Sequence, residues 1–136
     1  MADPRHGRGL IDTSVVIDLA LIEAADLPGE IAVSAITMAE LAAGPHATTD
    51  PAERARRQDR LQRAEATFEP LPVDIAVARA YGRVYAAVGA TGRKARGRRA
   101  VDLFIAATAV AAGLPLYTRN PDDFAGLSEI LEVVTV

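Results

Sequence analysis

The segment RAVDLFIAATAVAAG, residues 99–113, is rich in alanine and apolar at nearly every position. This composition predicts a helix, and Gly113 is placed to end it in the left-handed conformation that glycine adopts most readily. A helix that is apolar on nearly every face is expected to be buried. Asp102 is the exception in this segment, because a buried charge is costly unless it is neutralised, paired or bound to a metal.

The chain has 136 residues, enough for one domain with its own core. We expect a single domain over residues 1–136, with 1–8 as a loose lead-in. Cysteine is absent, and His6 and His46 lie far apart in polar segments, so a metal would have to be held by oxygen. Mg²⁺ and Mn²⁺ prefer such ligands. No stretch is long and apolar enough to cross a membrane, and the N-terminus lacks the apolar part of a signal peptide, which predicts a cytoplasmic protein.

Charge is distributed unevenly along the chain. The net charge of −3 does not indicate a general nucleic-acid binder. Five basic residues nevertheless gather just ahead of Asp102: Arg93, Lys94, Arg96, Arg98 and Arg99. Such a run can be a solvated loop, or it can contact phosphate groups.

Strand-like and helix-like segments alternate along the chain. We expect strands at 9–11, 30–34, 68–73, 114–118 and 130–136, and helices at 15–22, 36–43, 51–66, 75–88 and 99–112. Thr13 or Ser14 is a natural cap for the first helix. Pro70 and Pro72 interrupt the third strand and favour an edge position for it. The alternation predicts an α/β fold, a three-layer sandwich around a mostly parallel, five-stranded sheet.

Three carboxylates follow strands or open the central helix. Asp12 comes directly after the first strand, Glu40 lies just past the second, and Asp102 begins the helix at 99. The carboxyl ends of strands in open α/β sheets meet at a crevice where ligands bind, and residues 118–123 should reach the same edge. An acidic cluster without histidine or cysteine suits Mg²⁺ or Mn²⁺, which can bridge to a substrate phosphate.

Each carboxylate also has a structural interpretation. Asp12 could hydrogen-bond its own turn. Thr37 and Glu40 have the spacing of a capping box, which by itself would account for the glutamate. Asp102 in a first turn could favour the helix dipole by about 0.3–1 kcal/mol. That gain is small beside the cost of burying a carboxylate, so the functional interpretation is preferred for Asp102.

Four segments in this order resemble the motifs of PIN-domain ribonucleases, and within them those of VapC-type toxins from bacterial toxin–antitoxin pairs. They are LIDTSV at 10–15, SAITMAEL at 34–41, VDLFIAATA at 101–109 and YTRNPDDF at 117–124. The resemblance implies a PIN domain with a flavodoxin-like order of five parallel strands. It also implies Mg²⁺- or Mn²⁺-dependent RNA endonuclease activity, with Asp12, Glu40 and Asp102 as the acidic core.

The same resemblance implies partners for the chain: an RNA substrate, a second copy in a homodimer, and a VapB-type antitoxin that inhibits it in a hetero-oligomer. A helix of the antitoxin could dock where residues 23–27 and the helix at 51–66 flank one region. The Thr13, Ser14 and Thr118 hydroxyls could orient water or phosphate, and the basic run 93–99 would bind the RNA backbone.

The chain departs from the family pattern at one position. Many relatives carry a fourth acid where Asn120 stands here. Asp122 or Asp123 could compensate, or Asn120 could bind a metal through its carbonyl or through water. Asp123 can also be read as a turn residue or a helix cap.

Two other function classes remain open at this point. Asn120 favours a catalytically weak or inactive module of the same fold that binds RNA or protein. A phosphatase with Asp12 as nucleophile is disfavoured, because such enzymes need a second aspartate two residues on, where Ser14 stands.

Overall fold

The computed structural model describes residues 6–92 and 98–136. Its strands are β1 (Arg8–Ile11), β2 (Glu30–Ala32), β3 (Leu116–Thr118) and β4 (Val133–Thr135), and they pair in parallel in the order β2-β1-β3-β4. The longer helices are α1 (Thr13–Ile17), α2 (Ala35–Ala43), α3 (Pro51–Thr67), α4 (Ile75–Gly89) and α5 (Arg98–Ala112). Short 3₁₀ helices follow α1, α2 and β3: η1 (Leu19–Leu21), η2 (Ala24–Asp26), η3 (Gly44–Ala47) and η4 (Pro121–Phe124).

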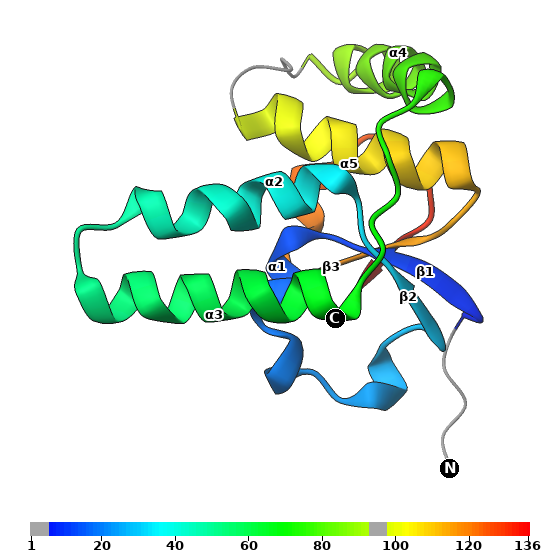
Figure 1. The fold of residues 1–136 in the computed structure, drawn as a ribbon. Coiled ribbons are helices and arrows are strands. Elements are labelled where there is room, and N and C mark those ends of the chain that lie inside the picture. The colour runs from blue at the N-terminus through cyan, green and yellow to red at the C-terminus, as the bar shows by residue number, and fades with distance from the viewer. Residues whose placement is uncertain (1–5, 93–97) are drawn as a thin grey trace.

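Helices cover both faces of the sheet (Figure 1). Successive residues of a strand point to opposite faces, so Leu10 and Leu116 enter the core formed with α4 and α5. Their neighbours Ile11 and Tyr117 enter a second core formed with α1, α2 and α3. All four side chains are fully buried. The expected three-layer α/β sandwich with a parallel sheet is confirmed.

The described residues form four strands, not the expected five. At 68–73 the chain keeps only a bridge between Leu71 and Ser34, with main-chain hydrogen bonds from Leu71 N to Val33 O (2.8 Å) and from Ala35 N to Leu71 O (2.9 Å). Pro70 and Pro72 have no N–H group to continue the ladder on either side. The prediction of a full strand here is wrong, because the flanking prolines stop the pairing after one residue.

The helix α1 is shorter than predicted from the sequence, whereas α5 ends at the predicted residue. The first helix was expected at 15–22 behind Thr13 or Ser14, but α1 spans only Thr13–Ile17 and its N-cap is Asp12, whose side chain accepts a hydrogen bond from Val15 N. The prediction that the hydroxyl of Thr13 or Ser14 caps this helix is therefore wrong. The helix α5 ends as expected, with Gly113 at a φ of +67°.

The strand order places a topological switch point between β1 and β3. These strands are neighbours, while the chain continues from β1 to β2 on one side and from β3 to β4 on the other. At such a switch point the loops leave in opposite directions and open a ligand-binding crevice at the carboxyl ends of the strands. Asp12 directly follows β1 and Thr118 ends β3, so both lie at this point. None of the helices in the described ranges is long and apolar enough to cross a membrane.

Candidate active site

Asp12 is a buried carboxylate that receives three hydrogen bonds. Its side chain is 5% exposed. Its Oδ1 accepts from Ser14 Oγ (2.5 Å) and Val15 N (3.2 Å), and its Oδ2 accepts from Thr118 Oγ1 (2.6 Å). Within residues 6–92 and 98–136, no ion pair joins Asp12 to lysine or arginine. Among the described residues, hydroxyl and amide groups rather than cations contact this carboxylate.

Main-chain groups orient the two hydroxyls that hold Asp12. Thr118 Oγ1 accepts a hydrogen bond from Asn120 N (2.9 Å), and Ser14 Oγ accepts one from Arg119 N (3.2 Å). Each hydroxyl therefore directs its proton to the carboxylate. The residues after β3 and the start of α1 together fix the plane of the Asp12 carboxylate.

Glu40 reaches the same rim from α2. Thr13 Oγ1 lies 2.5 Å from Glu40 Oε1 and 3.1 Å from the buried hydroxyl of Thr37. The capping-box interpretation of Thr37 and Glu40 is wrong, because α2 begins earlier and its N-cap is Ser34, whose Oγ accepts from Ile36 N (3.0 Å). Glu40 thus lies in the second turn of α2 and binds across to Thr13, the residue next to Asp12.

Asp102 lies in the second turn of α5 and is half-buried. The helix begins at Arg98, so its first turn contains no acidic residue and the dipole interpretation of Asp102 is wrong. One turn earlier, Arg99 donates a hydrogen bond from Nη1 to the carbonyl oxygen of Asp123 (2.8 Å). This contact ties the start of α5 to η4, the segment that follows β3, and brings α5 to the strand-end crevice.

The donor set fits a hard cation. Asp12, Glu40 and Asp102 offer carboxylate oxygens from three elements, and hydroxyls rather than cations surround the first two. In the part of the chain that the structure describes, no three histidine or acidic side chains gather into a finished ligand set. Mg²⁺ commonly binds one or two carboxylates and keeps several waters, so it does not require such a closed set.

The segment after β3 supplies the positions of the possible fourth ligand. Asn120 is exposed and stands at the N-cap of η4 without a side-chain cap hydrogen bond. Asp122 and Asp123 lie in the first turn of η4, where Asp123 N donates to Asn120 O (3.0 Å). Asp123 is therefore a turn residue, and the prediction that it caps the helix is wrong because Asn120 occupies that position.

The basic run is described only in part. Arg93, Lys94 and Arg96 lie outside the described residues. Arg98 begins α5, and the Arg99 guanidinium binds the Asp123 carbonyl. The role of this run in RNA binding stays a prediction.

Sequence reasoning missed one charged pair beside the site. Arg119 Nε lies 3.1 Å from Asp18 Oδ2, and the two residues join the end of α1 to the residue after β3. The signal available in the sequence was the position of Arg119 directly after the strand-ending Thr118. Asp18 gave no such signal, because it falls inside the segment expected to be a longer helix.

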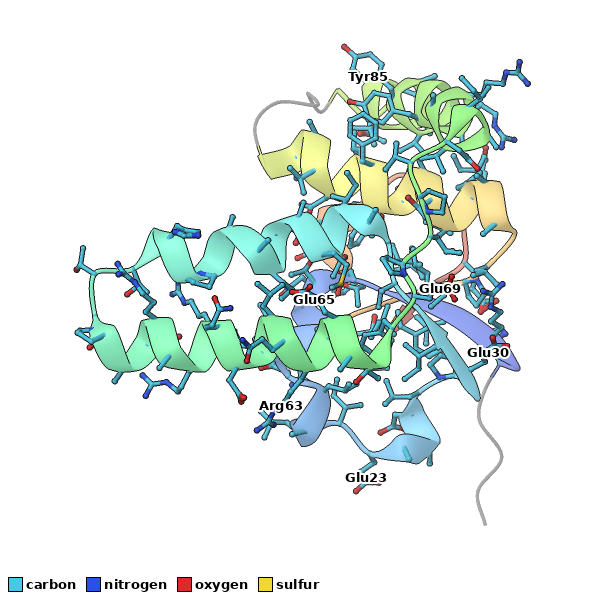
Figure 2. The ribbon with its side chains drawn as sticks, viewed as in Figure 1. Glu23, Glu30, Arg63, Glu65, Glu69 and Tyr85 are labelled. Carbon is cyan, nitrogen blue, oxygen red and sulfur yellow. The ribbon has the colours of Figure 1, made fainter. Side chains whose placement is uncertain are left out.

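Two grooves lie outside the strand-end crevice. One, of about 550 Å³, runs between α2 and α3 and is lined by Met38, Leu61 and Phe68, with Glu65 between the two helices (Figure 2). The other, also of about 550 Å³, lies between α3 and the α1–η1 segment and includes Ile17 and several arginines. Neither groove is lined by Asp12, Glu40 or Asp102, so both are separate from the carboxylate site.

Comparisons with known proteins agree with this architecture. The chain is 37% identical over 122 residues to ribonuclease VapC5 of Mycobacterium tuberculosis, covering 88% of this chain and 87% of that protein. It is 40% identical over 110 residues to ribonuclease VapC8 of the same species, covering 80% and 96%. The crystal structure of VapBC-5 from M. tuberculosis, a member of the VapBC family of toxin–antitoxin systems, superposes with a TM-score of 0.83 at 36% identity, covering 96% of this chain and 99% of that chain.

A protein-family model matches nearly the same part of the chain as these relatives. The model of the PIN domain matches residues 10–129, which include most of both cores and all three carboxylates. The chain belongs to the PIN-domain family.

Proposed function

We propose that this chain is a metal-dependent RNA endonuclease and the toxin of a toxin–antitoxin pair. The observation that carries the proposal is the buried Asp12 carboxylate at the β1–β3 switch point, connected to Glu40 through Thr13, in a chain similar to proteins named ribonuclease. A cytoplasmic location fits this proposal, because the substrate would be cellular RNA.

Asp12, Glu40 and Asp102 would hold Mg²⁺, and Mn²⁺ could substitute. Asn120, Asp122 and Asp123 border the same crevice and could complete the coordination. When bound, the metal would supply an activated water and neutralise charge on the phosphate.

The role of the surrounding hydroxyls is to position the carboxylates. Ser14 and Thr118 hold the two oxygens of Asp12, and Thr13 holds one oxygen of Glu40. Outer contacts of this kind fix the direction of ligand lone pairs and are costly to lose in metal sites. In this proposal, the chain itself contributes preorganised negative charge, which draws in the cation and excludes RNA until the cation is bound.

An RNA cleavage assay tests the proposal. Purified protein should cleave total RNA with Mg²⁺ and not with EDTA. The variants Asp12→Asn, Glu40→Gln and Asp102→Asn should each lose more than about 100-fold in rate, beyond the effect of removing an outer contact. Asp26→Asn is the matched control, because it removes one exposed carboxylate in η2, away from the crevice. Full activity of Asp102→Asn, or cleavage in EDTA, would contradict the assignment.

Asn120 favours a second candidate, a binding module of the same fold with weak or no catalysis. In that case the protein would bind RNA or another protein, and neither Mg²⁺ nor Asn120→Asp would produce cleavage. Metal-dependent cleavage by the unaltered chain excludes this candidate.

The antitoxin is proposed to occupy the groove between α3 and the α1–η1 segment. Ile17 lines this groove and is 46% exposed. Arginines on α3 line the groove opposite Ile17, and Figure 2 shows Arg63 on this side of the helix. Co-purification with the product of a neighbouring small reading frame tests the partner, and light scattering tests the expected homodimer. Free expression without growth arrest would count against the toxin assignment.

A further inference from the structure

The ion pair between Asp18 and Arg119 lies at the edge of the candidate active site. Arg119 Nε is 3.1 Å from Asp18 Oδ2, and the two side chains are 34% and 38% exposed. Asp18 is the C-cap of α1, the helix that begins beside Asp12. Arg119 follows Thr118, which donates a hydrogen bond to Asp12. The pair therefore connects the same two segments that hold the Asp12 carboxylate.

The backbone of Arg119 is fixed while its side chain remains accessible. Arg119 N donates to Ser14 Oγ (3.2 Å), and the same oxygen donates to Asp12 Oδ1 (2.5 Å). Ser14 Oγ therefore connects the main chain of Arg119 to Asp12, the proposed metal ligand, through two successive hydrogen bonds. The guanidinium itself is about one-third exposed and can be reached from solvent.

Three other arginines bind main-chain carbonyl groups. Arg99 binds the carbonyl of Asp123 beside the crevice. Arg54 and Arg57 bind main-chain carbonyls at the turn between α2 and α3. Arg119 instead has a half-exposed carboxylate as its side-chain partner, and exposed ion pairs of this kind are weak and screened by salt. Arg8, Arg56, Arg57 and Arg63 also pair with carboxylates, but Arg8 begins β1, at the end opposite to Asp12, and the other three lie on α3.

We propose that Arg119 is a phosphate-binding residue of the nuclease site, which Asp18 holds in the free protein and releases to the RNA backbone. This inference rests on the proposed nuclease function. A guanidinium matches the geometry of phosphate oxygens and can donate two parallel hydrogen bonds to them, so a phosphodiester competes well with one half-exposed carboxylate. Asp18 keeps the guanidinium at the rim and away from the site carboxylates.

Steady-state cleavage of a single-stranded RNA by Arg119→Gln, Arg119→Lys and Asp18→Asn tests the inference. Arg119→Gln should raise KM by roughly tenfold, the loss expected for one charge-assisted contact, with kcat changed less than about threefold. The KM of Arg119→Lys should lie between those of Arg119→Gln and the unaltered chain, because lysine keeps the positive charge but lacks the planar guanidinium that binds two phosphate oxygens. Asp18→Asn should lower KM, since it removes the competitor for the guanidinium.

RNA binding in the cleavage-deficient Asp12→Asn background, at a fixed high Mg²⁺ concentration, gives a second readout. Arg119→Gln should reduce the slope of log affinity against log salt by about 0.7, the value for one lost phosphate contact on a single strand. The effect of Asp18→Asn should vanish when Arg119→Gln is also present, which separates release of Arg119 from a general gain of positive charge.

A purely structural ion pair predicts a different pattern. Asp18→Asn and Arg119→Gln would then change KM in the same direction, and that outcome overturns the inference, as does an unchanged KM in Arg119→Gln. If Arg119→Gln does not fold, the other two variants test the inference. A KM that is not lowered in Asp18→Asn, or not raised in Arg119→Lys, then overturns it. Absence of cleavage by the unaltered chain would instead refute the proposed function.

Discussion

Thr118 donates the hydrogen bond that holds the Oδ2 atom of Asp12. Replacing it with valine keeps the shape of the side chain but removes this donor from a buried carboxylate and the acceptor for Asn120 N. We expect Thr118→Val to lower the free energy of unfolding by about 1–3 kcal/mol and to reduce cleavage. Urea denaturation measures the first effect. Thr118→Ser keeps the hydroxyl and serves as the control, so equal stability of the two variants would refute the role of this bond.

The sequence singled out candidate carboxylates but could not predict their individual contacts. Asp12 and Glu40 were identifiable because each follows a strand, and strand ends converge. That Asp12 also caps α1, and that Glu40 binds Thr13 instead of capping α2, depends on where each helix begins. A shift of one turn moved the cap of α2 from Thr37 to Ser34, and no pattern of residue types distinguishes the two.

Gly113 and Gly82 allow the effect of a Gly→Ala substitution to be compared at the end of one helix and inside another. Gly113 ends α5 at a φ of +67°, while Gly82 lies inside α4, and a Cβ at either position would meet no atom within 4 Å. Only backbone conformation therefore distinguishes them. Gly113→Ala should destabilise the protein by about 1 kcal/mol because alanine disfavours positive φ, and Gly82→Ala should stabilise it by about 0.5–1 kcal/mol. Thermal unfolding measures both, and changes of the same sign would contradict this account.

Helices were easier to predict from the sequence than strands. Helices α3 and α4 have clear capping residues at Asp50 and Asp74, and both begin where those residues indicate. The segment at 68–73 has strand-like residues, but its prolines permit only one paired residue. Alternating buried side chains cannot reveal this outcome, because it depends on which main-chain groups a neighbouring strand offers.

The fold connects segments that are far apart in the sequence. Asp12 follows β1, Glu40 lies in α2 and Asp102 lies in α5. Thr13, next to Asp12, binds Glu40, and Arg99 ties the start of α5 to η4 after β3. Among the described residues these carboxylates do not gather into a group of three, so the shared metal site stays a proposal. The parallel sheet between helical layers was predictable from the alternation of elements. The tie between α5 and η4 was not, because it depends on the main-chain carbonyl that Asp123 offers to Arg99.

Isothermal titration with Mn²⁺ tests the central claim, that these three carboxylates together form a metal site. We expect the unaltered chain and Asp26→Asn to bind Mn²⁺ alike, and Asp12→Asn and Asp102→Asn to bind at least about tenfold more weakly. Thermal unfolding of each variant verifies that it is folded. No binding by the unaltered chain would contradict the account, as would binding by Asp12→Asn or Asp102→Asn that is as tight as that of the unaltered chain.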